Sequence, residues 1–487
     1  MSRSARMAPA RPKPSVRRIA TGGAVASAAA DNRVHPVSAV DSQGSSPEPT
    51  SSTGSGTGRP TWSRRRFLAS TAAIASAASA ASATRGLAAS DDRPLRFGVI
   101  GVANRAASNL RGVSSQTISA LCDVDARYLE AAGKEFPEAR LYRDYRELLE
   151  SESELDGVVI STPDHHHAPA AMRAIRRGLA VYCEKPLTHT VAEARALTLA
   201  AREAGVATQM GTQIHATDNY RRVVEKIRGG IVGNVRRVHV WVGKGWAADA
   251  MPGPSGDAAP ESLAWDLWLG PAPDVDYTPG LHPAQWRRYR PYGTGTLGDM
   301  GCHYMDLPFW ALQLRSPDRV AAEGPEPHPD ACPHGLRVRY RFAATDHHDD
   351  LELVWHDGNL AADFVRDSGL PGSGVLFEGD RGKLVATYGS HSLVDGAGPG
   401  VTPTIDPIPA SIGHYEEWMA AIRGGDPALC HFDYAGPLTE CVLLGTVAHQ
   451  AGRPIRWDGD RAEVIADDEA QRFIGKSYRD GWQLAGG

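Results

Sequence analysis

The chain has 487 residues, which is long enough for two domains that each bury a sizeable hydrophobic core. Residues 1–90 carry 12 Lys and Arg against three Asp and Glu, whereas the other 397 residues carry 40 against 54, a net charge of −14. So acidic a body argues against nucleic-acid binding, because phosphates need a basic face, and no apolar run has transmembrane length. We therefore expect neither a nucleic-acid partner nor a stable membrane anchor.

The first ninety residues have the character of an export signal. Residues 1–60 are rich in Ser, Ala, Gly, Pro and Arg and too poor in apolar side chains to fold. The run Ser63-Arg64-Arg65-Arg66-Phe67-Leu68 and the Ala/Ser stretch after it resemble a twin-arginine signal, and small residues near Ala83 and Ala88 offer cleavage sites. We expect residues 1–90 to be a disordered leader and signal peptide, recognised by the twin-arginine translocation machinery of a bacterium, and the mature protein to be periplasmic or otherwise exported. A surface arginine cluster before a weak helix is the alternative.

The next segment has the layout of a dinucleotide site. Residues 95–100 (LRFGVI) predict a short buried strand, a tight turn and a helix follow, and a second strand, 117–122, ends at Asp123. In such a site the pyrophosphate lies on the helix N-terminus and the acid accepts hydrogen bonds from the ribose. The turn has alanine at two of the three usual glycine positions, so by itself it is a weak signal. Asp123 favours NAD over NADP, and Arg127 leaves NADP open. The expected cofactor-binding residues are Gly101, Ala103, Asn104, Arg105, Asp123 and Arg127.

Strands and helices continue to alternate up to Gly211, which predicts a parallel, doubly wound sheet. One strand ends in the run His165-His166-His167, which could suggest a metal. Histidines within one helical turn mostly point apart, however, and no partner spacing supports a site. The six cysteines also lack any regular spacing, so we expect free buried thiols, and no metal site.

The second half predicts another sheet and one wall of a cleft. A helix over 220–230 precedes a strand over 235–242, and residues 251–290 form a loop rich in Pro, Gly and Trp. Trp286 and Arg287 in this loop are candidate substrate-binding groups; packing of the loop is the alternative for them. Later predicted features are strands around 338–340 and 351–354, a hairpin at 378–382, and helices over 414–423 and 436–450.

Five segments then point to a known family. They occur in the order TPDxxH (162–167), EKP (184–186), QMGTQ (209–213), WDLWLGP (265–271) and GDMGCH (298–303). With them, residues 94–487 resemble the glucose–fructose oxidoreductase/inositol dehydrogenase (Gfo/Idh/MocA) family. The resemblance implies an α/β fold: an NAD(P)-binding Rossmann domain, 91–212, followed by an α+β domain, 213–487, with a large open, mostly antiparallel sheet for substrate binding and oligomerisation. A homodimer or homotetramer is then expected.

The resemblance also implies roles for single residues. Lys185 would contact substrate and nicotinamide ribose, and the Lys185–Pro186 bond is often cis in the family. Asp299 and His303 match its D-x-x-x-H pair. Further residues implied at the cofactor are Thr162, Pro163, His167, Glu184, Lys185 and Gln213, and those implied at the substrate are Lys185, Trp286, Arg287, Asp299 and His303.

These residue types suit the oxidation of a secondary alcohol. Residues 298–312 predict one helix, kinked near Pro308, in which Asp299 and His303 share a face. A base that titrates near neutrality suits the removal of the hydroxyl proton, which is the role expected of His303. Lys185 would stabilise alkoxide character, and Asp299 would orient the imidazole or bind a neighbouring hydroxyl. A solvated Asp/His pair on a helix surface is the alternative.

The expected function is an NAD(P)-dependent oxidoreductase that acts on a sugar, a polyol or a glycoside. Free NAD is scarce outside the cytoplasm, so an exported member is expected to hold its cofactor tightly and regenerate it in each cycle. It could oxidise one sugar and reduce another, or act as an NAD-dependent glycosidase through transient oxidation and elimination. A catalytically silent sugar-binding regulator is the alternative from another class.

Overall fold

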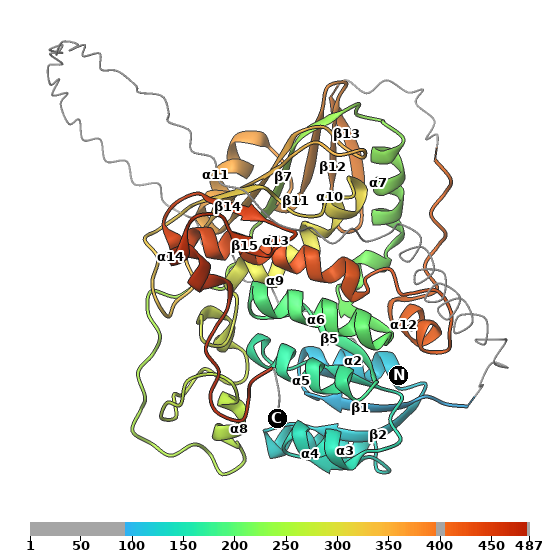
Figure 1. Cartoon of the computed structure of the whole chain (residues 1–487), viewed down its shortest axis with the longest axis vertical. Coiled ribbons are helices and arrows are strands. Elements are labelled where there is room, and N and C mark those ends of the chain that lie inside the picture. The colour runs from blue at the N-terminus through green and yellow to red at the C-terminus, as the bar shows by residue number, and fades with distance from the viewer. Residues whose placement is uncertain (1–92, 396–404, 485–487) are drawn as a thin grey trace, which may run out of the picture. The chain divides into compact units, whose positions relative to one another are not determined.

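The computed structural model describes residues 93–395 and 405–484 (Figure 1). The predicted leader and signal peptide lie outside the described residues. None of the described helices combines the length and the apolar character that crossing a membrane requires.

The first sheet has six parallel strands in the order β3-β2-β1-β4-β5-β6. Chain order reverses between β1 and β4, and doubly wound sheets bind ligands beside that point, at the carboxyl ends of the strands. Helices lie on both faces of the sheet (Figure 1). The strands are β1 (Arg96–Ile100), β2 (Thr117–Cys122), β3 (Arg140–Tyr142), β4 (Gly157–Ile160), β5 (Ala180–Glu184) and β6 (Thr208–Gly211), and the helices are α2 (Arg105–Val113), α3 (Ala126–Glu135), α4 (Tyr145–Ser151), α5 (Asp164–Arg176) and α6 (Val191–Ala204).

Helix caps fix where the chain turns at this end of the sheet. Asp125 and Asp144 cap α3 and α4, each accepting a hydrogen bond from a backbone N–H in the first turn. Thr190 and Glu193 form a reciprocal capping box at the start of α6. These caps define the connections that follow β2, β3 and β5.

The second sheet has nine strands in the order β13-β12-β11-β7-β10-β9-β8-β14-β15. Among the described strands of this sheet only the central pair, β7 and β10, is parallel, so the sheet is mostly antiparallel, as predicted. The fold class is thereby confirmed. The strands are β7 (Val235–Val242), β8 (Arg319–Glu323), β9 (Arg337–Phe342), β10 (Leu351–Asp357), β11 (Ser373–Gly379), β12 (Lys383–Ala386), β13 (His391–Asp395), β14 (Ile455–Asp458) and β15 (Glu463–Val464).

The predicted helix over 298–312 is two helices, which corrects the expectation of a single kinked one. One ends at Tyr304 and the next begins at Asp306, because Pro308 has no N–H to donate to the carbonyl of Tyr304. The helices of this half are α7 (Asp218–Arg228), α8 (Trp265–Leu269), α9 (Gly295–Tyr304), α10 (Asp306–Ala311), α11 (Gly358–Ser368), α12 (His414–Ile422), α13 (Phe432–Ala451) and α14 (Asp468–Gln471), with 3-10 turns η1 (Gln213–Ala216), η2 (Gln285–Arg288) and η3 (Arg472–Ile474).

Helix α12 packs against the first sheet although it lies far along the chain. Trp418 stacks on Phe97 with ring centroids 5.0 Å apart, and both side chains are fully buried. Helix α12 therefore belongs to the core of the first sheet although it follows most of the second sheet in the chain.

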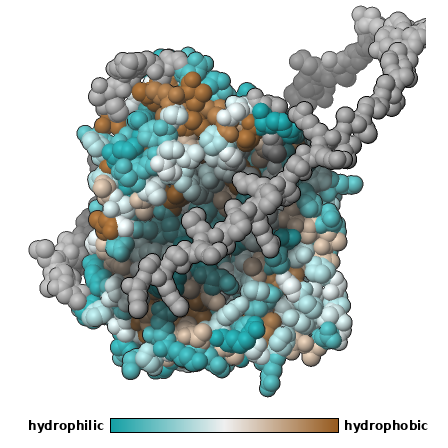
Figure 2. Space-filling view, turned by 180° about the vertical axis from the view of Figure 1, so that it is seen from behind, coloured by the Kyte–Doolittle hydropathy of each residue, from teal (hydrophilic) through white to brown (hydrophobic). Residues whose placement is uncertain are grey.

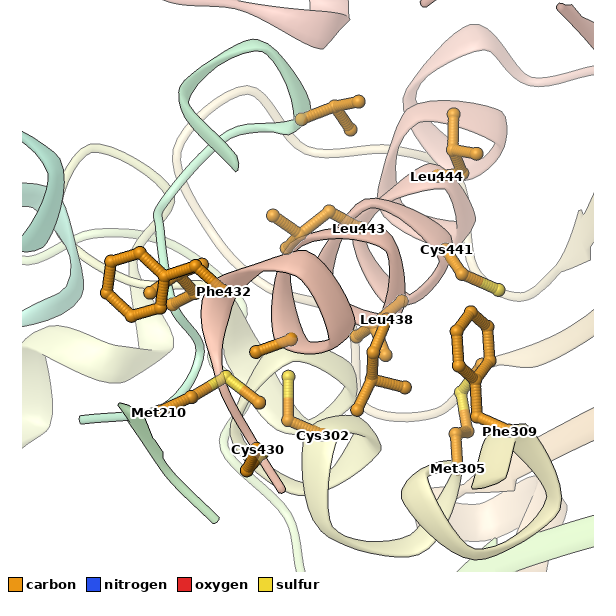
Figure 3. Close-up of a cluster of buried hydrophobic side chains, with 14 of the residues drawn as sticks. Met210, Cys302, Met305, Phe309, Cys430, Phe432, Leu438, Cys441, Leu443 and Leu444 are labelled. Atoms are coloured by element: carbon orange, nitrogen blue, oxygen red, sulfur yellow. The ribbon is translucent and has the colours of Figure 1, made fainter. Parts of the chain in front are cut away.

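A hydrophobic cluster fixes α9 between the two sheets. Figure 3 shows Cys302 and Met305 of α9 and its continuation facing α13, with Leu438 and Cys441 on the other side and Met210 of β6 nearby. The buried face of α9 is thus locked, and its opposite face is free to carry a site. All six cysteines are buried free thiols.

An apolar patch lies on the surface at the end of the molecule that the second sheet occupies. Figure 2 shows a mostly hydrophilic face with a hydrophobic patch at that end. In the edge strand β13, Leu393 and Val394 are exposed. The oligomeric state stays a prediction.

Candidate active site

A cavity of about 390 Å³ opens where the strand order of the first sheet reverses. Both domains line it: the carboxyl ends of β1, β2, β4 and β5 on one side, and α9 with the loop before it on the other. Of the residues predicted for the site, it brings together Gly101, Ala103, Asn104, Arg105, Asp123, Thr162, Pro163, Glu184, Lys185, Gln213, Trp286, Arg287, Asp299 and His303.

The turn after β1 is built for close approach of a ligand to the backbone. Gly101 has φ +84°, and a Cβ there would lie 2.7 Å from the carbonyl oxygen of Ser161, so no larger residue fits. Asn104, just before α2, has φ 54°, an uncommon conformation for a non-glycine residue. The N-terminus of α2 faces the cavity, and no described side chain caps it, which suits a pyrophosphate.

Asp123 lies where a ribose would be bound. Its Oδ2 accepts a hydrogen bond from Val102 N at 3.0 Å and its Oδ1 accepts one from Asp125 N at 3.0 Å. Arg127 does not line the cavity, because its guanidinium pairs with Asp125 at 2.6 Å on the surface. The structure thus corrects the placement of Arg127: the acid that favours NAD is in place, and the arginine that would favour NADP is not.

Asp299 gathers three cations at the other end of the cavity. Its Oδ1 accepts from Lys185 Nζ at 2.5 Å and lies 3.4 Å from Arg287 Nε, and its Oδ2 accepts from Lys244 Nζ at 3.0 Å and from Trp246 Nε1 at 2.8 Å. Burial alone would raise the pKa of Asp299, but the cations outweigh it and hold the pKa well below its usual range. Asp299 is therefore a permanent anion.

Asp299 does not accept hydrogen bonds from all the N–H groups of the Lys185 ammonium. It donates to the side chain and to the backbone carbonyl of Asp299, the latter at 3.0 Å. An ammonium has three donors, so one N–H remains for a ligand in the cavity. Lys185 also follows the buried strand β5 and precedes a cis peptide bond to Pro186.

His303 presents a neutral imidazole to the same cavity. Burial, together with the charge of Lys185, lowers its pKa to about 3, which corrects the expectation that this base titrates near neutrality. Among the described residues neither ring nitrogen has a hydrogen-bond partner, and only Nδ1 is buried, which leaves Nε2 accessible from the cavity. No hydrogen bond joins Asp299 to this ring in the described part of the chain, so Asp299 organises the lysines and does not orient the imidazole.

Glu184 ties the cofactor side of the cavity together. It accepts hydrogen bonds from Arg105 Nε at 3.0 Å, from Asn109 Nδ2 at 2.9 Å and from Gln213 Nε2 at 2.9 Å. Burial alone would raise the pKa of Glu184, but Lys185 and Arg105 outweigh it and lower the pKa. Glu184 and Gln213 thus position the start of α2 relative to Lys185.

His167 supports the cavity from behind instead of lining it. Its ring nitrogens lie 2.8 Å from the carbonyl oxygen of Pro186 and 3.0 Å from that of Thr162, and the side chain is buried. The first turn of α5 directs it inward, so His166 lines the cavity in its place. This corrects the predicted contact of His167 with the cofactor, while Thr162 and Pro163 do line the cavity.

Arg287 and Trp286 form the wall between the cavity and α5. Arg287 Nη1 donates to the buried Asp164 at 2.9 Å, and the guanidinium lies 4.4 Å from the centroid of the Trp286 ring. Thr294, just before α9, donates to the same Asp164 at 2.7 Å. The pair of Asp164 and Arg287 therefore links α5 to the helix that carries Asp299.

Sequence reasoning missed Lys244 and Trp246. Both line the cavity directly after β7 and both bind Asp299, which lies more than fifty residues further along the chain. The signal in the sequence is a lysine and a tryptophan two residues apart at the carboxyl end of a predicted strand. Also missed were Tyr128, His282 and Trp482 at the Asp123 end. The described residues contain no group of three or more His, Cys, Asp or Glu arranged to hold a metal.

Comparison with known proteins gives both close and distant similarities. A D-apiose dehydrogenase of Paraburkholderia graminis is 36% identical over 25% of this chain and 32% of its own length. An inositol 2-dehydrogenase of Leifsonia xyli is 35% identical over 30% of this chain and 44% of its own length. The matches thus span less than half of these relatives. The crystal structure of aldose–aldose oxidoreductase from Caulobacter crescentus with glycerol superposes with a TM-score of 0.52 at 17% identity, covering 75% of this chain and all of that one, so the fold is shared.

Two family models cover the described domains. The NAD-binding Rossmann fold of the oxidoreductase family matches residues 95–212, and the C-terminal alpha/beta domain of the same family matches residues 236–484. The second match alone covers half of the chain. The chain belongs to the Gfo/Idh/MocA oxidoreductase family, and its first domain is the NAD-binding one.

Proposed function

We propose that this protein is an NAD-dependent oxidoreductase that acts on a secondary hydroxyl of a sugar, a polyol or a glycoside. The observation that carries the proposal is one cavity that joins the Gly101 turn and Asp123 to the ammonium of Lys185 and the imidazole of His303. The D-apiose and inositol dehydrogenases among its relatives support a polyhydroxy substrate.

The residues at the reactive end have complementary roles in this proposal. NAD bound along the Gly101 turn supplies the hydride acceptor. His303 takes the hydroxyl proton through its accessible Nε2, which is free to accept because the ring is neutral. Lys185 donates its remaining N–H to the same oxygen and stabilises negative charge there. Asp299 holds Lys185, Lys244 and the indole N–H of Trp246 in position.

We further propose that the cofactor stays bound between turnovers. A strap formed by residues 262–264 pairs with residues 124–126, directly after Asp123. Ala126 N donates to Ser262 O at 2.8 Å, and Ala264 N donates to Val124 O at 3.0 Å. The strap thus lies beside the Asp123 end of the cavity, and in this proposal release of the cofactor requires it to move.

The decisive experiment starts from the full chain purified without added nucleotide. We expect unfolding to release NAD(H) in stoichiometric amount, identified by mass spectrometry, and the native protein to convert pairs of free sugars with no added cofactor. Lys185→Met should lower turnover by about 10²-fold or more and still release NAD(H), because its ammonium acts on the substrate oxygen. Hydrolysis of aryl glycosides would favour the glycosidase route.

A matched control for that variant is Lys383→Met, which removes a lysine paired with Glu378 in the second sheet. Turnover in this control should match the parent chain. A purified protein without nucleotide would refute retention of the cofactor. Wild-type turnover of Lys185→Met would refute the assignment of the site.

We also propose export by the twin-arginine route, supported by the run from Ser63 to Leu68. Replacing Arg64 and Arg65 together by lysine should keep the protein in the cytoplasm of a bacterial host, measured by fractionation and immunoblotting. Arg66→Lys is the control, because it leaves both signal arginines in place, and export should persist. Equal export of all three proteins would contradict the proposal.

A further inference from the structure

A second cavity, of about 340 Å³, lies beside the segment that leads into α9. Residues 293–297 line it, and no residue lines both this cavity and the candidate active site. Its size is in the range of sites for small molecules. The oxidoreductase function proposed above assigns no role to it.

Arg290 supplies an unbalanced charge to this cavity. Its Nε donates to the carbonyl oxygen of His328 at 3.0 Å, and its Nη2 lies 3.2 Å from Nδ1 of His449. No carboxylate among the described residues pairs with it, and its Nη1 has no hydrogen bond there. Burial lowers the pKa of Arg290, as expected for a guanidinium that lacks a counter-ion.

Three more polar side chains face the same space without partners in the described part of the chain. Arg472 forms no ion pair, and the side chains of Thr446 and Gln450 form no hydrogen bonds. Thr446 and Gln450 are four residues apart on α13, so they share one face of that helix. Arg472 is exposed and Thr446 and Gln450 are half-buried, so their polar atoms are accessible to a ligand that enters the cavity.

The other ionisable groups on the wall include a lysine that is already paired and one carboxyl group. Lys476 lines the cavity but pairs with Glu193 at 2.9 Å, so it adds no net charge. Asp357 is the only carboxyl group among the described lining residues, and it already accepts hydrogen bonds from Leu336 N and Trp355 Nε1. Burial raises the pKa of Asp357 to about 6, which reduces its negative charge in mildly acidic solution. The two arginines therefore outnumber the one carboxyl group of the described lining, and the net charge of the wall is positive.

We propose that this second cavity binds a small organic anion, a carboxylate or phosphate with neighbouring hydroxyls such as a sugar acid, through Arg290 and Arg472, with Thr446 and Gln450 binding the hydroxyls. Guanidinium groups bind planar carboxylates and phosphates through paired hydrogen bonds. The hydroxyl of Thr446 and the amide of Gln450 donate and accept, which fits a polyol.

The test is calorimetric titration of the full chain, as purified with its bound nucleotide, with gluconate, inorganic phosphate and uncharged glucose. We expect gluconate to bind, phosphate to bind more weakly, and glucose not to bind at this site. Arg472→Glu should weaken gluconate binding at least tenfold. Because Arg472 is exposed and unpaired, the substitution leaves the fold intact. Gln450→Leu should weaken gluconate but not phosphate.

Two controls separate this site from the candidate active site. Arg111→Glu changes an exposed arginine on α2 outside both cavities, and Lys244→Gln changes the first cavity only. Both should bind gluconate as the parent chain does. Loss of binding in Lys244→Gln with retention in Arg472→Glu would place the anion in the first cavity and overturn the proposal, and so would the absence of binding at millimolar concentrations of both anions.

Discussion

At the scale of single residues, the unusual group is a buried histidine beside a lysine. Burial and Lys185 lower the pKa of His303 to about 3, so the imidazole stays neutral at any pH above about 4. As a base it is then available throughout the range in which the protein is assayed. We expect kcat/KM to show no acid limb near the ordinary histidine pKa, measured from pH 8 to pH 5.

The variant Lys185→Met tests whether the charge of Lys185 lowers the pKa of His303. Removing the neighbouring positive charge raises the pKa of His303, so the acid limb of the residual activity should move to higher pH. His303→Asn should lower kcat by about 10²-fold or more without releasing the nucleotide. An acid limb at the same pH in the parent chain and in Lys185→Met would show that another group controls the profile.

Whether a residue of this site could be predicted depends on how far apart in the sequence its contacts lie. Lys185, Asp299 and His303 follow from short motifs, because local spacing and family resemblance are visible in the sequence. Lys244 and Trp246 do not, since they matter only through Asp299, which α9 brings to them from the second half of the chain. The prediction that Arg127 binds the cofactor was wrong for a local reason. Its guanidinium donates a hydrogen bond to Asp125, two residues before it.

At the scale of elements, removing a hydrogen bond of the strap tests whether this backbone pairing retains the cofactor. Ala126 is the first residue of α3, where proline is tolerated, and Asp125 before it is extended. Ala126→Pro therefore removes only the N–H that donates to Ser262 O. Loss of one hydrogen bond, about 1 kcal/mol, should raise the rate of NAD release about fivefold, measured by trapping released nucleotide.

Asp218→Pro is the matched control for the strap. It places proline at the first residue of α7, also after an extended residue, and removes only an exposed ion pair with Arg222 at 3.6 Å. Release from this control should match the parent chain. Equal release from Ala126→Pro would mean that the strap does not limit dissociation.

Elements were predictable where periodicity or turn chemistry is local. The strands of the first sheet other than the three-residue β3, and the hairpin between β11 and β12, follow directly from the sequence pattern. The break between α9 and α10 can be predicted only by noting that Pro308 has no N–H to donate to the carbonyl of Tyr304. The packing of α12 on the first sheet has no local signal, because Trp418 and Phe97 meet only in the folded chain.

At the scale of the whole molecule, buried neutral histidines make stability depend on pH. Burial lowers the pKa of five of them to about 3 or 4: His166, His189, His303, His356 and His414. The unfolded chain binds protons at these residues below about pH 6.5 and the folded chain does not. Stability is therefore lost as pH falls from 6.5 towards 4, at up to about 1.4 kcal/mol per histidine and pH unit.

The carboxyl group of Asp357 acts in the opposite direction. Burial raises the pKa of Asp357 to about 6, so the folded chain takes up a proton there between pH 6 and pH 4 and gains stability. This gain in stability offsets the loss that about one of the five histidines causes. The net expectation is a free energy of unfolding that is several kcal/mol lower at pH 5.5 than at pH 7.5, measured by urea unfolding of the holoprotein.

His166→Phe isolates one contribution to this loss. The imidazole of His166 makes edge contacts with Tyr145 and Trp482, which a phenyl ring can retain, and its hydrogen bond to Trp268 O is shared with His165. The stability lost between pH 7.5 and pH 5.5 should shrink by about 1 kcal/mol in this variant. In the control His347→Asn, an exposed position, the loss should equal that of the parent chain. If both variants lost as much stability as the parent, buried neutral histidines would not be what makes the fold sensitive to acid.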